Sequence, residues 1–137
     1  MTLTYQQQYV LDGLQARAEI LNLTARHNRL YAAGDLAGWI ATFRHSGATY
    51  RRDGQEFSDL RAAFDGGDAR RLVTADNEIV VDGVHATQRC VALLFVDGQP
   101  RSTGVFDDRL IYERGGWYFT SRELTWDPVP VALPSEG

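Results

Sequence analysis

Apolar residues in the first third of the chain recur every three or four positions. The residues that share this spacing are Ile20, Leu23, Leu30 and Tyr31. This period is typical of an amphipathic helix, and His27 lies on the same stripe. We expect a helix over residues 12–33, with Asp12 as its N-cap and Gly34 just beyond its end.

Short elements follow up to residue 67. Asp35 is a suitable cap for a second helix over 36–43, and residues 48–52 have the composition of a short strand. A third short helix is expected over 59–64, with Ser58 as its cap. The Asp53–Gly54 dipeptide between the strand and this helix is a turn signal.

From residue 71 onward the pattern changes to strands. The segments expected to be extended are 71–74 with 78–81 (bulged at 75–77), 86–96, 102–112 and 117–126. Glycine-containing turns separate them, as in an antiparallel meander. The fold class is therefore α+β, with a curved antiparallel or mixed sheet wrapped around N-terminal helices and enclosing a cone-shaped pocket. We expect one domain over 1–137, with its core at about 12–127 and an extended, proline-containing tail at 128–137.

Composition narrows the classes of function. The chain has 137 residues, 44% of them hydrophobic and 23% charged, which is ordinary for a folded domain. Its 14 Lys+Arg against 18 Asp+Glu give a net charge of −4, and all 14 basic residues are arginine. An acidic chain has no electrostatic footprint for nucleic acid, so no nucleic-acid partner is expected.

The single cysteine, Cys90, excludes an internal disulfide. Because it lies in an apolar run, we interpret it as a buried thiol rather than a nucleophile. No segment is long and apolar enough for a membrane span, and the first residues do not resemble a signal peptide. We therefore expect no membrane partner and a cytoplasmic location.

Four local motifs together resemble the SnoaL-like branch of the nuclear-transport-factor-2-like fold. They lie in Glu19–His27, Ala33–Phe43, Val80–Ala86 and Gly115–Arg122. The resemblance covers about residues 18–126 and implies the same cone-shaped fold. Members of this superfamily include dehydratases, isomerases, cyclases, epoxide hydrolases and non-catalytic modules, so function must be judged from the site.

The resemblance supplies two catalytic templates, and each is incomplete here. In the Asp–His dyad of the dehydratase-like members, the Asp position corresponds to about Ala32 and the His position to Arg71 or Leu72. Arginine stays protonated and cannot be a general base, so a dyad enzyme is disfavoured.

The second template is the limonene-epoxide-hydrolase-like set. Its arginine corresponds to Arg89, its first carboxylate to Val91, its second to Glu123 and its tyrosine to Tyr50. The surviving residues suit a reaction that needs one acid/base and a positioning donor. Two alternatives stay open: Arg89 and Glu123 form only a cross-strand salt bridge, or a one-residue slip turns Arg122 inward in place of Glu123.

The remaining candidates are weighed against ordinary structural roles. His27 is either an acid/base at the pocket or a core histidine, and Tyr50 is either a proton donor or a core aromatic. No two histidines share metal-ligand spacing, and there is no glycine-rich phosphate loop, so we expect neither metal nor cofactor. The residues expected to line a pocket for a small apolar molecule are Tyr31, Trp39, Phe43, Phe64, Arg71, Val91, Phe106, Arg122 and Trp126.

These observations favour a cofactor-independent acid/base enzyme acting on a small, apolar, oxygenated metabolite. The reaction would be isomerisation, cyclisation, dehydration or epoxide opening, with Glu123, Arg89, Tyr50 and His27 as catalytic residues. The alternative is a non-catalytic binding or accessory domain. By resemblance, we expect a homodimer formed through the outer face of the sheet.

Overall fold

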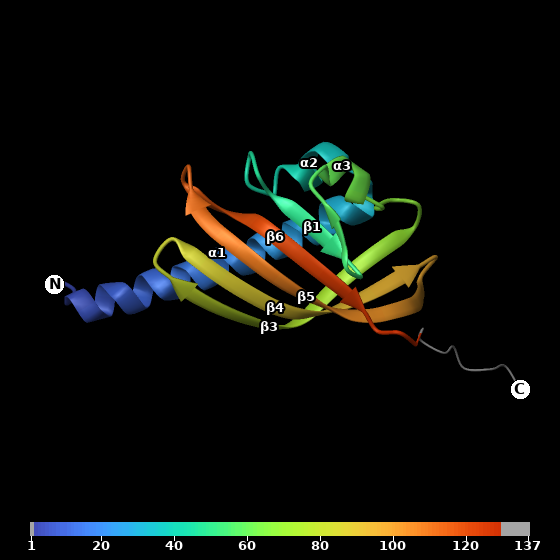
Figure 1. The fold of residues 1–137 in the computed structure, drawn as a ribbon. Helices are drawn as coiled ribbons and strands as arrows, with labels where there is room; N and C mark the ends of the chain where they lie inside the picture. Colours follow the sequence, from blue (N-terminus) through green and yellow to red (C-terminus); the bar gives the residue numbers. More distant parts are fainter. Residues whose placement is uncertain (1, 130–137) are drawn as a thin grey trace, which may run out of the picture.

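The computed structural model describes residues 2–129, in which two layers, one of helices and one of sheet, face each other. The elements in chain order are α1 (Tyr5–Ala33), α2 (Leu36–Ile40), β1 (Thr49–Arg52), β2 (Gln55–Phe57), α3 (Leu60–Ala63), β3 (Arg70–Asp82), β4 (His85–Val96), β5 (Gln99–Glu113) and β6 (Gly116–Trp126). Figure 1 shows the helices on one side of the curved sheet. The predicted α+β architecture is confirmed.

The strands form one six-stranded sheet in the order β2-β1-β6-β5-β4-β3. All neighbouring strands are antiparallel except β1 and β6, which are parallel. The predicted bulge in β3 is confirmed, because the register shifts between Ala75 and Glu78. Strand β2 was not predicted; it follows directly from the predicted turn at Asp53–Gly54.

The helices begin and end close to the predicted positions, with three differences. Helix α2 ends at Ile40 rather than at Phe43, which forms an isolated β-bridge with Phe119. Helix α1 begins seven residues earlier than Asp12, because Thr4 and Gln7 form a capping box at its start. This first part of α1 projects beyond the sheet (Figure 1) and is exposed. Helix α3 is capped by Asp59 rather than Ser58. Within residues 2–129, no helix is long and apolar enough to cross a membrane. Most of the predicted tail, residues 130–137, lies outside the described residues.

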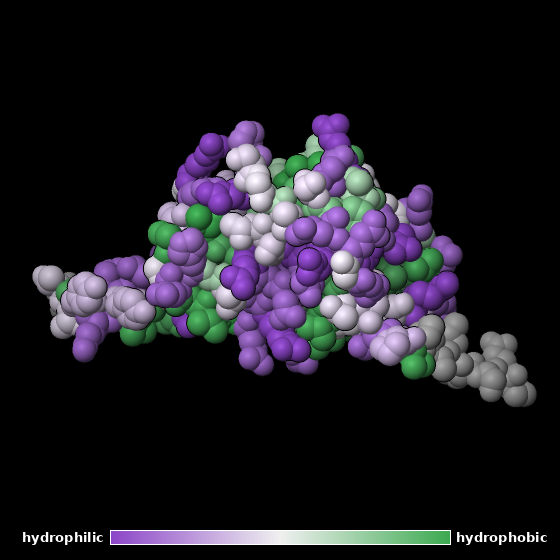
Figure 2. Space-filling view, viewed as in Figure 1, coloured by the Kyte–Doolittle hydropathy of each residue, from purple (hydrophilic) through white to green (hydrophobic). Residues whose placement is uncertain are grey.

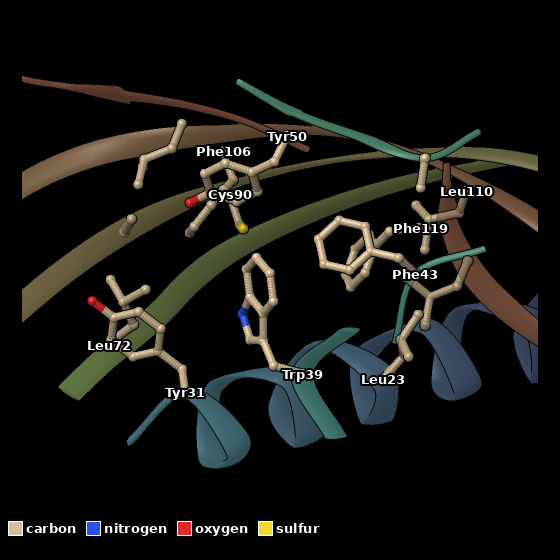
Figure 3. Close-up of a cluster of buried hydrophobic side chains, with 14 of the residues drawn as sticks. Leu23, Tyr31, Trp39, Phe43, Tyr50, Leu72, Cys90, Phe106, Leu110 and Phe119 are labelled. Carbon is tan, nitrogen blue, oxygen red and sulfur yellow. The ribbon is translucent and has the colours of Figure 1, made fainter. Parts of the chain in front are cut away.

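The concave face of the sheet and the helices enclose an interior filled with aromatic rings. The largest are Trp39, Phe43, Phe106 and Phe119, all at most 2% exposed. Figure 3 shows Trp39 reaching up from the helical layer toward the strands that carry Tyr50, Cys90 and Phe106. The interior of the cone is therefore packed by the chain's own side chains.

Candidate functional site

Six polar side chains are buried inside this aromatic interior and form what we call the polar interior cluster. They are Thr24, His27, Thr42, Gln88, Asp108 and Arg122, each at most 2% exposed. Buried polar groups cost free energy unless they are hydrogen-bonded. The partners of each group therefore show what the cluster can do.

The centre of the cluster is an ion pair between neighbouring strands. Arg122 on β6 donates from Nε to Asp108 Oδ1 at 2.7 Å and from Nη2 to Asp108 Oδ2 at 3.0 Å. Both side chains have no exposed area. The guanidinium also lies over two rings, 3.7 Å from the centroid of Phe106 and 4.5 Å from that of Phe119. Such a bidentate, stacked arginine is held in one orientation.

Further hydrogen bonds fix the carboxylate side of this pair. Gln88 Nε2 donates to Asp108 Oδ2 at 3.0 Å and to Thr24 Oγ1 at 2.9 Å. Gln88 Oε1 accepts from Asn77 Nδ2 at 2.9 Å. Burial raises the pKa of Asp108, while the charge of Arg122 opposes that rise. Asp108 is thus a carboxylate whose function is to hold Arg122 and Gln88.

Two donors in this interior have no hydrogen-bond partner among residues 2–129. They are Arg122 Nη1 and Trp39 Nε1. A buried donor without an acceptor costs about 1–3 kcal/mol, and such a group in a folded protein calls for an explanation. An acceptor oxygen of a ligand would satisfy either one.

His27 on α1 is the titratable base of the cluster. Its Nδ1 lies 2.8 Å from Thr42 Oγ1. Thr42 has one hydroxyl proton, which it donates to the carbonyl oxygen of Trp39 at 2.6 Å, so Thr42 must accept from His27. The imidazole therefore carries its proton on Nδ1 and a lone pair on Nε2. Burial, and next the charge of Arg122, hold the pKa of His27 well below its usual value.

Other predicted pocket residues surround this cluster. The His27 ring lies 5.1 Å from that of Trp39 and 5.6 Å from that of Phe43, centroid to centroid. Tyr50 is buried on β1, and burial raises the pKa of its hydroxyl. The structure thus brings His27, Tyr31, Trp39, Phe43, Tyr50, Phe64, Phe106 and Arg122 to one interior. Trp126 packs at its edge, half-buried.

Four predicted site residues lie elsewhere. Glu123 is on the outer face of the sheet, with its side chain 49% exposed and 3.9 Å from Arg51. Arg89 is 68% exposed and pairs with Asp107 rather than with Glu123. The assignment of Glu123 and Arg89 to the interior is wrong, and the alternative of a salt bridge between them is wrong too, because each pairs with another residue.

Val91 and Arg71 also point away from the interior. Val91 shares the outer phase of β4 with Arg89, since Gln88 and Cys90 occupy the inner phase. Arg71 is exposed on β3, next to the buried Leu72. Figure 2 shows hydrophilic side chains over the middle of the face formed by β5 and β6.

A bulge in β6 decides between Arg122 and Glu123. Trp117 and Phe119 are buried, so strict alternation would place Glu123 inside. The register between β5 and β6 shifts at Arg109/Leu110, where Thr120 is the extra residue. A bulge of one residue exchanges the two faces of the strand. Arg122 therefore faces inward, which was the alternative left open from the sequence.

Sequence reasoning missed four members of the cluster, and two of them carried a signal. Asp108 has the same phase as Phe106 and Leu110 in β5, and Gln88 the same phase as Ala86 and Cys90 in β4. A polar residue in the inward phase of a strand is the sign of a buried partner. Thr24 and Thr42 carried no such signal, because the role of a small hydroxyl residue depends on which other segments of the chain pack against it.

Two surface hollows lie apart from this interior. One of about 560 Å³ is lined by α2, α3 and the β5–β6 turn, including Ile40, Arg44 and Tyr118. Another of about 570 Å³ lies between the start of α1 and the pair Tyr112 and Trp117. Neither is lined by the unpartnered donors of the interior.

Comparisons with known proteins show which family pattern and which solved structures the chain is similar to. The sequence pattern of the SnoaL-like domain matches residues 12–123. No curated protein matches the chain. Among solved structures, an NTF2-like protein with a cystatin-like fold from Novosphingobium aromaticivorans has 21% identity and a TM-score of 0.76, covering 91% of each chain.

Two further solved structures are similar to this chain in fold. Rv3472 from Mycobacterium tuberculosis has 26% identity over 82% of this chain and 76% of its own, with a TM-score of 0.69. ActVI-ORFA from Streptomyces coelicolor has 19% identity over 82% of this chain and 98% of its own, with a TM-score of 0.67. With most of its length matched by the family pattern, the chain belongs to the SnoaL-like domain family.

Proposed function

We propose that the chain binds a small, oxygenated, largely apolar molecule in its interior and catalyses cofactor-independent acid–base chemistry on it. In this proposal His27 removes a proton from carbon, and Arg122 binds the oxygen on which negative charge develops. The observation that carries the proposal is the pair of unpartnered buried donors, Arg122 Nη1 and Trp39 Nε1, in the same interior as a neutral imidazole.

His27 has the properties of a general base. Because its pKa is lowered, the imidazole is neutral at pH 7. The bond to Thr42 leaves the lone pair on Nε2 and fixes the ring plane. A base held in one tautomer by its other nitrogen is the usual arrangement in histidine catalysis.

Arg122 has the properties of an electrostatic stabiliser. Its charge does not titrate, and Asp108 and the two stacked rings fix its position before any ligand binds. Preorganised donors of this kind stabilise an oxyanion more than they stabilise a neutral carbonyl. The free Nη1 is the atom that would donate to it.

The step that this set supports is enolisation. The C–H bond next to a carbonyl breaks, its electron pair forms the carbon–carbon double bond, and the carbonyl oxygen becomes the oxyanion near Arg122. His27 holds the proton as imidazolium and returns it to the same or another carbon. Isomerisation of an unsaturated ketone, dehydration of a β-hydroxyketone and aldol-type ring closure can each begin with this step. The aromatic lining favours a flat, apolar substrate.

A second candidate is a binding module without catalysis. The observation that favours it is the packing of the interior by Trp39, Phe43 and Phe119, which a ligand would have to displace. In that case the free donors of Arg122 and Trp39 would only bind acceptor oxygens of the ligand, and no proton would be transferred.

The test uses cyclic aryl ketones as probes, with 1-tetralone first. NMR in D₂O follows deuterium incorporation next to the carbonyl, and quenching of tryptophan fluorescence follows binding. We expect exchange to fall about 100-fold in His27→Gln, the lower end of the usual general-base contribution, and to stay unchanged in the control Glu123→Gln. Binding without exchange would support the binding module. Equal exchange in wild type and His27→Gln would refute the assignment of the base.

A further inference from the structure

The segment that joins α3 to β3, residues 64–69, covers the interior, and we call it the strap. Its first residue, Phe64, lies 5.2 Å from Trp39 and 6.1 Å from Tyr31, ring centroid to ring centroid. The rest of the strap is neither helix nor strand. Figure 1 shows it as the green connection leading from α3 into β3. The strap therefore lies over the two aromatic residues that border the interior at this end.

The bonds that hold the strap include two exposed ion pairs and two backbone hydrogen bonds, one of which runs from the N–H of Asp97 to the carbonyl oxygen of Ala69 at 3.0 Å. Asp65 pairs with Arg70 at 3.2 Å and with Arg52 at 3.6 Å, and its side chain is 43% exposed. The N–H of Gly67 donates to the carbonyl oxygen of Tyr31 at 2.8 Å. Exposed ion pairs are weak because water and salt screen them. These contacts can be broken without unfolding the sheet.

The end of the strap has the backbone of a strained hinge. Gly67, Asp68 and Ala69 have φ of +77°, +50° and +59° in succession. The left-handed region is unfavourable for a residue with a side chain, so Ala69 stores strain in the closed form. At Gly66 a Cβ atom would lie 2.4 Å from the carbonyl oxygen of Tyr31. The strap thus packs closely against the end of α1 and is strained at its junction with β3.

We infer that the strap is a gate, which turns about residues 67–69 and lifts Phe64 from Trp39 to admit a ligand to the interior. As a route for substrate, the gate rests on the proposed function, but its opening is a property of the protein alone. In the closed form the interior is packed and buried. The strap is a part of its wall that is held by weak, exposed ion pairs and that has a strained backbone at residues 67–69. Opening it releases strain at Ala69 while the sheet keeps its pairing.

The single cysteine provides a reporter for this opening. Cys90 is 2% exposed, and Figure 3 shows its sulfur pointing from β4 toward Trp39. Burial raises the pKa of the thiol to about 11. In the closed form the thiol is therefore both shielded and protonated. A disulfide reagent such as dithiobis-nitrobenzoate will react only when the interior opens, its sulfur bonding to the Cys90 thiolate as one thionitrobenzoate leaves.

The experiment compares labelling rates of Cys90 in the intact protein. Asp65→Asn removes both ion pairs and should speed labelling about fivefold, the factor expected for two exposed pairs. Arg70→Gln removes one of these ion pairs and also the hydrogen bond from Arg70 Nε to the Tyr31 hydroxyl (3.1 Å), so it should likewise speed labelling and provides a second variant. The matched control, Glu113→Gln, removes the exposed pair with Arg44 (3.2 Å) away from the strap and should leave the rate unchanged.

Low concentrations of urea separate gate opening from global unfolding. A local opening exposes little surface, so its rate should depend weakly on urea, whereas global unfolding depends on it steeply. Labelling that is equally fast in Asp65→Asn and wild type would overturn the inference. So would a labelling rate that follows global unfolding across the urea series. Neither measurement involves turnover, so the gate can be confirmed even where the ketone assay fails.

Discussion

The buried ion pair between Asp108 and Arg122 permits a quantitative test of the interior. Arg122→Met keeps a long apolar side chain between Phe106 and Phe119 but leaves Asp108 as a buried charge without its partner. Asp108→Asn keeps the shape of the acid and leaves Arg122 unpaired. Each side chain has no exposed area, so neither remaining charge can turn to solvent.

We expect each single variant to lower the free energy of unfolding by about 3–5 kcal/mol, the usual cost of removing one partner of a buried pair. The double variant leaves no unpaired charge, so its cost should be close to that of one single variant. The coupling energy is then equal to the cost of one single variant, about 3–5 kcal/mol. A domain typically has about 5–15 kcal/mol of stability, so the single variants should still fold in the cold.

The assay is urea unfolding at pH 7, followed by tryptophan fluorescence. The matched control is the pair Arg89 and Asp107, which also joins neighbouring strands but is 68% and 59% exposed at 3.9 Å. Removing either partner there should cost no more than about 1 kcal/mol. If the costs of Arg122→Met and Asp108→Asn add to within about 0.5 kcal/mol in the double variant, the two groups do not form a desolvated pair.

Three further predictions address His27 and the strap. Because the pKa of His27 is lowered in the fold, the unfolded chain binds a proton below about pH 6.5 that the folded chain does not, so wild type should lose stability more steeply than His27→Gln as the pH falls from 6.5 to 5, by at most about 1.4 kcal/mol per pH unit; parallel stability–pH curves would contradict this. Ala69→Gly relieves a φ of +59° and should raise the free energy of unfolding by about 1 kcal/mol, measured by urea unfolding; a loss of stability would show that the residue is unstrained. Gly66→Ala places a methyl group 2.4 Å from the carbonyl oxygen of Tyr31 and should cost about 2 kcal/mol by overpacking, and an unchanged melting temperature would exclude that contact.

Local signals in the sequence were sufficient for most of the architecture. The apolar stripe through Ile20 and Tyr31 and the Asp–Gly turns placed α1 and the hairpins, because helix period and turn chemistry are properties of neighbouring residues. The start of α1 was missed because its apolar residues, such as Tyr5, Tyr9 and Val10, are exposed, so the buried stripe does not extend to it. Only the capping residues Thr4 and Gln7 mark it.

The candidate site was less predictable because it depends on strand phase. A one-residue bulge near Thr120 exchanges Glu123 for Arg122 inside the fold, and no local feature of the sequence marks that bulge. The inward phase of Asp108 was visible beside Phe106 and Leu110. Its partner was not, because the pairing of β5 with β6 is set by contacts between distant residues.

The same ion pair has a consequence for how the last hairpin reaches its native alignment. If β6 formed without its bulge, Glu123 would enter the interior near Asp108 and Arg122 would turn to solvent. Two carboxylates would then be buried without a cation, which costs several kcal/mol. Backbone hydrogen bonds alone would tolerate the register without the bulge. The two buried carboxylates make that register unfavourable. The ion pair between Asp108 and Arg122 therefore stabilises the bulged register of the β5–β6 hairpin relative to the register without the bulge.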